Sequence, residues 1–441
     1  MKQSSMRPIQ VGLLGIGTVG SGVWDVLNRN ADEIQRRAGR AIRIAQVADQ
    51  DTKKAQAIVR KQARVLSDGF ALARDKSIDI VVELVGGCTV ARELVLEAIR
   101  RGKHVVTANQ ALLATHGNEI FKAAQKKGVM VAFEASVAGG IPIIKALREG
   151  LAANRIEWIA GIINGTSNFI LSEMRARGSS FGDALRSAQR RGYAEADPSF
   201  DIEGVDAAHK LTILSALAFG IPMQFKKAYT EGIAKLTQED IRYAEELGYR
   251  IKLLGITKRV EKGIELRVHP TLIPARRLIA NVEGVMNAIL VKGDAVGATM
   301  YYGAGAGSQP TASAVVADLV DITRLITADP EHRVPHLAFQ PDRLARDPIL
   351  PIGEVRTSYY LRMRVKDRPG VLADITRILA DSRISIDAMV QKEPGEGEQR
   401  VDIVMLTHLA VEKNVDAAMA KIERLPTVVG KVTRIRLEEL L

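Results

Sequence analysis

The chain has 441 residues, 46% apolar and 26% charged, a composition that is typical of two to four globular domains and excludes a fibrous or disordered chain. Its 62 Lys and Arg residues against 51 Asp and Glu give a net charge of +11, but they are scattered among acidic neighbours without the interleaved aromatics of a nucleic-acid interface, and a polyanionic cofactor would be served equally well. A single cysteine excludes an intramolecular disulfide, and the N-terminus "MKQSSMRPIQ" and the short apolar runs predict a cytoplasmic protein with no membrane partner.

Short apolar runs alternate with amphipathic stretches throughout residues 1–150. We expect strands at 9–16, 41–49, 79–86 and 104–109, and helices at 18–37, 51–59 and 91–102. Strands and helices that alternate at this pace predict a parallel, doubly wound α/β sheet of the Rossmann type.

The stretch "GLLGIGTVGSGV" joins the first strand to the first helix. There, Gly15 permits a tight turn, Gly17 lets backbone N–H groups approach phosphates, and Gly20 lets helix and strand pack closely. Thr18 and Val19 open the helix, whose N-terminus offers a partial positive charge. This context predicts dinucleotide binding, with a purely structural turn as the alternative.

Asp49 ends the second predicted strand, where an acidic residue would bind the ribose hydroxyls of the cofactor. It lies farther from the glycines than is usual, and the nearby Lys53 and Lys54 could instead hold a 2′-phosphate. The sequence therefore leaves NAD and NADP both open.

The chain changes character after residue 150. Strand-like pieces at 155–165, 263–273 and 280–303 mix with predicted helices at 168–177, 181–190, 204–219 and 237–253, which indicates an α+β domain over 151–310 for substrate binding and oligomerisation. A helix at 311–330 is expected to complete the first domain, and a proline-rich linker over 331–355 follows. Residues 356–441 predict a compact module with the order strand, helix, strand, strand, helix, strand.

Acidic residues are densest in "GYAEADPSFDIEGVDAAHKLTIL", positions 192–214. Asp206 and Lys210 are four residues apart, so they share one face of the predicted helix. An exposed ion pair with helix-capping acids is one interpretation. The other is a pocket whose carboxylates bind an ammonium group and whose lysine transfers a proton. Spacing alone leaves both open.

Six motifs taken together resemble homoserine dehydrogenases over residues 8–326. They are "GLLGIGTVGSGV", "GKHVVTANQALLA", "FEASVAGGIPII", "GIINGTSNFIL", "GYAEADPSFDIEGVDAAHKL" and "YYGAGAGSQPTASAVVADL". The final module, with "VKDRPGVLADITRIL", resembles an ACT domain, a ferredoxin-like βαββαβ fold that senses amino acids. The resemblance implies reversible NAD(P)H-dependent reduction of L-aspartate 4-semialdehyde to L-homoserine, in threonine, methionine and isoleucine biosynthesis.

The resemblance also implies roles for individual residues. Lys210 would be the proton donor and acceptor at the substrate oxygen, oriented by Asp206. Substrate contacts would come from Glu195, Asp201, Tyr193, Gly165 and Thr166; cofactor contacts from Gly15, Gly17, Thr18, Val19, Gly20, Asp49, Gln110 and Gly305; and a monovalent cation, usually sodium, would be held by Glu134 and the carbonyls of Val137, Gly139 and Ile141.

Gln110 departs from the family pattern, which usually has a lysine after "VTAN". Glutamine donates hydrogen bonds but carries no charge and passes no proton. This leaves two alternatives: an oxidoreductase for another amino-acid semialdehyde, and a catalytically weakened sensor that binds threonine without oxidising NADPH. Oxidation of the semialdehyde to an acyl phosphate would need a reactive thiol. Cys88 is the candidate, and we interpret it instead as a small packed residue.

The ACT resemblance implies feedback inhibition by L-threonine, with Asp367 and Gly370 nearest the ligand. Removal of residues 356–441 is then expected to leave an active enzyme that ignores threonine. Both the middle domain and ACT modules commonly associate through exposed sheets, which predicts a homodimer or homotetramer.

Overall fold

The computed structural model describes residues 7–330, 333–392 and 399–440. Parts of three predictions lie outside these ranges: residues 1–6 of the N-terminus, residues 331–332 of the linker, and residues 393–398 and 441 of the final module. Contacts divide the chain into two compact units. The first runs to Gly165 and adds Asp206–Lys226 and Met286–Asp347; the second comprises Thr166–Val205, Lys227–Val285 and the chain from Pro348 onward.

The first unit is built on a six-stranded sheet in the order β3-β2-β1-β4-β5-β6, with every pair parallel. This confirms the doubly wound fold. The order changes direction between β1 and β4, and sheets of this kind bind ligands beyond the carboxyl ends of the strands at such a point. The elements are β1 (Ile9–Leu14), α1 (Thr18–Arg29), α2 (Ala31–Ala38), β2 (Ile42–Ala48), α3 (Thr52–Val59), β3 (Arg64–Leu66), α4 (Gly69–Arg74), β4 (Ile80–Glu83), α5 (Thr89–Arg100), β5 (His104–Thr107), α6 (Gln110–Lys127) and β6 (Val131–Ala132).

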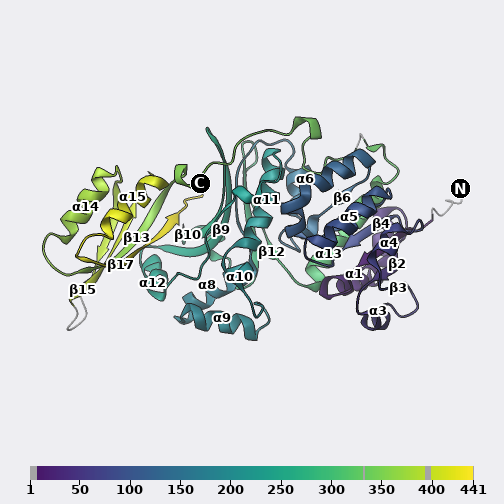
Figure 1. Ribbon diagram of the computed structural model, residues 1–441, viewed down its shortest axis with the longest axis horizontal. Coiled ribbons are helices and arrows are strands. Elements are labelled where there is room, and N and C mark those ends of the chain that lie inside the picture. Colours follow the sequence, from purple (N-terminus) through teal and green to yellow (C-terminus); the bar gives the residue numbers. More distant parts are fainter. Residues whose placement is uncertain (1–6, 331–332, 393–398, 441) are drawn as a thin grey trace. The chain divides into compact units, whose positions relative to one another are not determined.

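Helix α13 (Ser308–Leu325) packs onto this sheet beside α1, although it comes much later in the chain (Figure 1). Val315 and Leu319 share a buried core with Val11 of β1. Ser308 Oγ donates to the carbonyl oxygen of Thr18 at 2.8 Å. The residues that follow the "GAGAG" turn therefore complete the helical cover of the sheet, because an open parallel sheet must be buried on both faces.

The first unit also contributes three neighbouring antiparallel strands to the second sheet, in the order β12-β11-β7. Helix α11, which carries Asp206 and Lys210, is buried along nearly its whole length. Even so, none of the helices in the described part of the chain is long and apolar enough to cross a membrane. The elements are α7 (Ile143–Lys145), β7 (Ile156–Ile162), α11 (Val205–Phe219), β11 (Met286–Gly293) and β12 (Gly297–Ala304).

The second unit holds the middle helices, a long hairpin and the C-terminal module. Its elements are α8 (Gly165–Arg177), α9 (Phe181–Arg190), α10 (Ser199–Ile202), β8 (Tyr229–Thr230), α12 (Gln238–Glu246), β9 (Tyr249–Val260), β10 (Gly263–Pro274), β13 (Arg356–Lys366), α14 (Val371–Asp381), β14 (Ile386–Gln391), β15 (Arg400–Thr407), β16 (Ala410–Val411), α15 (Glu412–Ile422) and β17 (Val428–Leu437).

The C-terminal module has the ferredoxin-like order β17-β13-β15-β14, which confirms the predicted βαββαβ fold. One edge of it is not free. Strand β17 pairs in parallel with β10, with Arg436 opposite Thr271 and Leu437 opposite Leu272. The module and the β9–β10 hairpin therefore form one continuous sheet, which the sequence did not predict.

Two predicted helices are wrong in extent. The helix expected at 18–37 is two helices, because Asn30 leaves helical geometry and serves both as the end of α1 and as the cap of α2. The helix expected at 237–253 ends at Glu246, since Gly248 adopts a left-handed conformation (φ +82°) and Tyr249 begins strand β9.

Candidate active site

Lys210, which is half-buried, and Asp206, which is buried, form an ion pair on α11. Lys210 Nζ donates to Asp206 Oδ2 at 2.7 Å and to the carbonyl oxygen of Ile163 at 3.1 Å. The two side chains are 15% and 6% exposed, so the interpretation as a solvent-exposed pair is wrong. An ammonium group has three N–H donors, and within the described residues the third has no acceptor. It is free to meet a substrate oxygen.

Two amides hold the same carboxylate. Gln110 Nε2 donates to Asp206 Oδ1 at 3.1 Å, and Asn164 Nδ2 donates to Oδ2 at 2.9 Å. Gln110 opens α6 and Asn164 follows β7, so three elements converge on Asp206. These hydrogen bonds fix the carboxylate, which in turn orients the lysine. The sequence reasoning missed Asn164, although it stands inside the quoted "GIINGTSNFIL" motif.

The glycines of the first loop have the packing that their spacing predicted. Gly15 has φ +89°, and a Cβ there would lie 2.8 Å from the carbonyl oxygen of Leu84. A Cβ at Gly20 would collide with the Gly15 carbonyl, whereas one at Gly17 would meet nothing within 4 Å. Gly15 and Gly20 thus bring helix and strand together, and Gly17 leaves open space at the start of α1, where no side chain caps the helix. This cradle fits a dinucleotide pyrophosphate.

Asp49 lies directly beside this loop. Its Oδ2 accepts the backbone N–H of Ile16 at 2.8 Å, and its Oδ1 accepts that of Asp51 at 2.9 Å. The carboxylate therefore joins the end of β2 to the loop between β1 and α1, and each oxygen keeps a second lone pair for a ribose hydroxyl.

A buried carboxyl group, missed by sequence reasoning, organises the ends of β4 and β5. Glu83 is fully buried; it accepts Thr107 Oγ1 at 2.6 Å and the backbone N–H of Val85 at 3.0 Å. Burial raises the pKa of Glu83 above its usual range. Thr107 in turn accepts the backbone N–H of Asn109, whose side chain caps α6. This chain of contacts fixes the helix start at which Gln110 stands.

The glycine-rich loop after Glu134 packs tightly against the later "GAGAG" turn. The carboxylate of Glu134 accepts the backbone N–H groups of Ile144 and Lys145 at 2.8 and 2.9 Å. A Cβ at Gly139 would lie 2.6 Å from the carbonyl oxygen of Gly305, and Gly140 donates to Ala304. The loop therefore offers a buried carboxylate and backbone carbonyls with little room for side chains.

Gly305 itself is constrained by Asn287. A Cβ at position 305 would collide with the Asn287 amide, which is almost fully buried on β11. Only glycine fits there without displacing the Asn287 side chain, so the turn before α13 is held closely against β11.

The predicted substrate residues of the second unit lie in and after α8. Thr166 Oγ1 donates to the carbonyl oxygen of Tyr193 at 2.6 Å, and Ser167 Oγ donates to that of Asp201 at 3.0 Å. Tyr193 is partly exposed, and its ring meets Phe169 edge to face with centroids 5.0 Å apart. Glu195 is exposed in the same turn. Contacts within this unit thus tie the start of α8, next to Gly165, to the acidic run.

In the C-terminal module, Asp367 and Gly370 lie in the exposed turn between β13 and α14. Asp367 donates its backbone N–H to Gln399, and Gly370 has φ +92° directly before the helix. The turn leaves both residues open to a ligand.

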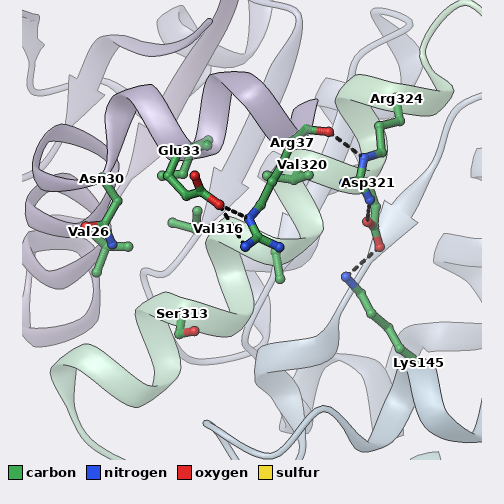
Figure 2. A pocket seen from close by; sticks show the side chains of 12 residues that line it. Val26, Asn30, Glu33, Arg37, Lys145, Ser313, Val316, Val320, Asp321 and Arg324 are labelled. Carbon is green, nitrogen blue, oxygen red and sulfur yellow. Dashed lines mark hydrogen bonds and ion pairs between the residues drawn. The ribbon is translucent and has the colours of Figure 1, made fainter. Parts of the chain in front are cut away.

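A separate pocket lies between α2 and α13 and contains none of the predicted site residues (Figure 2). Its charges are paired: Glu33 with Arg37, and Lys145 with Asp321 at 2.5 Å. Arg324 also donates to the Arg37 carbonyl. The ion pairs and hydrogen bonds that line this pocket fasten α13 to the neighbouring helices.

Comparisons with known proteins match nearly the full length of this chain. The homoserine dehydrogenase NAD-binding domain matches residues 15–134, homoserine dehydrogenase matches 142–320, and the ACT domain matches 359–427. Homoserine dehydrogenases of Pseudomonas aeruginosa and Neisseria gonorrhoeae are each 60% identical over 99% of this chain and all of theirs. This chain belongs to the homoserine dehydrogenase family.

A solved homoserine dehydrogenase of Thiobacillus denitrificans is 71% identical, with a TM-score of 0.95 over 99% of this chain and all of that one. One from S. aureus is 34% identical, with a TM-score of 0.76 over 98% of this chain and 99% of that one. Homoserine dehydrogenases are oxidoreductases, and the NAD-binding match covers the glycine loop. The family and its nicotinamide cofactor confirm the principal prediction; the comparisons give no support to the acyl-phosphate chemistry at Cys88 or to another semialdehyde.

Proposed function

We propose that the chain reversibly converts L-aspartate 4-semialdehyde and L-homoserine with Lys210 as the acid and base. When bound, NAD(P)H supplies the hydride to the terminal carbon of the aldehyde. Negative charge then develops on the aldehyde oxygen, and Lys210 delivers one proton to it, so that hydride and proton together give the alcohol. Support comes from the Lys210 ammonium group beside Asp206, which keeps one N–H without an acceptor among residues 7–330, 333–392 and 399–440.

Asp206 orients this lysine, and Gln110 and Asn164 support Asp206. We assign substrate binding to the acidic run because an amino-acid substrate carries an ammonium group that carboxylates recognise. Glu195 and Asp201 would supply that charge, and Tyr193, Gly165 and Thr166 would line the site.

The glycine loop, the first turn of α1 and Asp49 fit the dinucleotide, and Gln110 and Gly305 are proposed to reach its nicotinamide end. Asp49 suits the ribose diol of NAD, while Lys53 and Lys54 suit the 2′-phosphate of NADP. The proposed cofactor contacts are Gly15, Gly17, Thr18, Val19, Gly20, Asp49, Gln110 and Gly305.

The loop after Glu134 fits a monovalent cation such as sodium. Its donor set is hard oxygen, from Glu134 and the carbonyls of Val137, Gly139 and Ile141, and each Glu134 oxygen keeps a lone pair beyond the backbone N–H it accepts. Burial raises the pKa of Glu134, and a cation beside the carboxylate would offset that burial. The ion would hold the loop against Gly305.

ACT domains imply regulation by an amino acid, and we propose L-threonine, bound near Asp367 and Gly370. We also propose a homodimer or homotetramer in the cytoplasm. The exposed edge strand β12, on which Tyr302 is 58% exposed, offers an unpaired surface for association. Light scattering during size-exclusion chromatography measures the subunit number.

The test is an optical assay of purified protein with aspartate semialdehyde and NADPH or NADH, with and without sodium and threonine. We expect turnover that requires the semialdehyde, rises with sodium and falls with threonine. Threonine binding without any NAD(P)H oxidation would contradict the proposal and support the alternative of a sensor weakened by Gln110.

A further inference from the structure

A buried ionic network joins the C-terminal module to the segment 229–233 of the second unit. Arg436 on β17 is 1% exposed and donates to Glu412 of α15 and, at 2.8 Å, to Glu231. It also donates to the Tyr229 hydroxyl at 3.0 Å, which itself donates to Glu231 at 2.8 Å. Glu231 is thus the point at which the module's buried arginine meets the rest of the unit.

Segment 229–233 is packed directly behind the residues that follow Asp201. Ile233 donates its backbone N–H to the carbonyl oxygen of Ile202 at 2.9 Å. A Cβ at Gly232 would collide with that same carbonyl and lie 2.7 Å from the Cα of Glu203. Since no side chain separates the two backbones, a shift of one requires a shift of the other.

We propose that Glu231 is a positioning residue that fixes the Asp201 segment, and that Arg436 holds Glu231 in place. This inference rests on the proposed role of Asp201 in substrate binding. It gives the C-terminal module a physical route to the substrate site within one unit: β17 carries Arg436, Arg436 binds Glu231, and the Glu231 segment backs the Asp201 segment.

Charge makes the contact specific. Burial opposes the ionised form of Glu231, but Arg436, the Tyr229 hydroxyl and Arg434 together outweigh it, so that the pKa of Glu231 is lowered. If the charge of Glu231 is removed, Arg436 still donates to Glu412, so this buried arginine keeps an ionised partner inside the module. The contact that is lost is the one that holds the 229–233 segment.

The experiment compares the full-length Glu231→Gln and Arg436→Lys variants with Glu439→Gln. Glutamine keeps the shape of the Glu231 side chain. Lysine keeps the charge of Arg436 but lacks the planar guanidinium group that donates to several partners at once. Glu439 is the matched control, because its ion pair with Arg276 is exposed. Steady-state kinetics with L-homoserine are measured together with hydrogen exchange of the backbone amides of residues 202–204.

We expect both network variants to raise KM for homoserine about 3- to 30-fold, with kcat and cofactor KM within about twofold and faster exchange at 202–204. The control should match the wild type. Wild-type KM and exchange in Glu231→Gln would overturn the inference, and wild-type values in Arg436→Lys alone would overturn the part assigned to Arg436. If the wild type itself does not turn over, the proposed function fails, while the exchange comparison still decides this inference.

Discussion

At the scale of single residues, the site depends on the hydrogen bonds that the carboxylate of Asp206 accepts. Asp206 accepts Lys210, Gln110 and Asn164. The i,i+4 pair could be predicted, since both residues belong to one helix. Asn164 could not, because it reaches Asp206 only once β7 and α11 have packed together.

Replacement of Asn164 by Ala is expected to lower kcat about 10- to 100-fold, because a hydrogen bond to a charged group is worth about 1.5–3 kcal/mol. Cofactor affinity should not change. Stopped-flow oxidation of NAD(P)H measures the effect, with the exposed Asn28→Ala on α1 as the control. A kcat equal to that of the control would mean that Gln110 and Lys210 alone orient Asp206.

At the scale of elements, different glycines of the first loop serve packing and cofactor binding. A Cβ at Gly17 meets nothing, so Gly17→Ala should keep the melting temperature but raise cofactor KM about tenfold by blocking the phosphates. Gly20→Ala should instead lower the melting temperature, because its Cβ collides with the Gly15 carbonyl. Gly150→Ala, also in open space, is the control. Equal melting temperatures in Gly17→Ala and Gly20→Ala would contradict this division of roles.

A buried histidine makes the parallel sheet sensitive to acid. His104 Nδ1 accepts the backbone N–H of Met130 at 2.9 Å, and burial, with Arg333 as a lesser cause, lowers the pKa of His104 to about 4. Between pH 6.5 and 4 the unfolded chain binds more protons at this site than the folded chain. Stability is therefore full above pH 6.5 and falls with acidification, by about 3 kcal/mol at pH 4.

His104→Asn keeps an acceptor near the Nδ1 position and removes the titration. Urea unfolding at several pH values should show a shallower loss of stability for the variant than for the wild type between pH 6.5 and 4. Parallel curves would show that His104 does not titrate in this way.

Element boundaries were predictable where local signals were strong. Helix α9 has the bounds predicted for it, because Ser180 caps it and an amphipathic pattern follows. The first residues of strand β9, 249–253, were predicted as the end of a helix, since an apolar run fits either structure until it pairs with β10. The Rossmann order followed from alternation, and the helix expected at 311–330 to complete that domain is α13, which packs onto the sheet beside α1.

At the scale of the whole molecule, the sequence predicted the order of the domains along the chain but not the strand pairing that joins the C-terminal module to its unit. The pairing of β17 with β10 depends on two strands that are far apart in sequence. Arg267, which is almost fully buried, also takes Glu438 as a partner at 2.6 Å. These contacts join residues 356–441 to the rest of the second unit, so their removal takes away part of that unit's packing.

Deletion of residues 356–441 is therefore expected to lower the melting temperature and the yield of soluble protein, because it exposes the edge of β10 and takes Glu438 from Arg267. Thermal unfolding of the truncated and full-length chains measures this. A truncated chain with full-length stability and kcat would restore the view of an independent regulatory module.

The proposed role of Lys210 is to supply the proton to the substrate oxygen. Single-turnover oxidation of bound NAD(P)H by aspartate semialdehyde tests this role in Lys210→Ala, beside the exposed Lys262→Ala and with cofactor affinity measured by calorimetry. We expect a rate about 10²- to 10⁴-fold lower in Lys210→Ala at unchanged cofactor affinity. A rate equal to that of Lys262→Ala would contradict it.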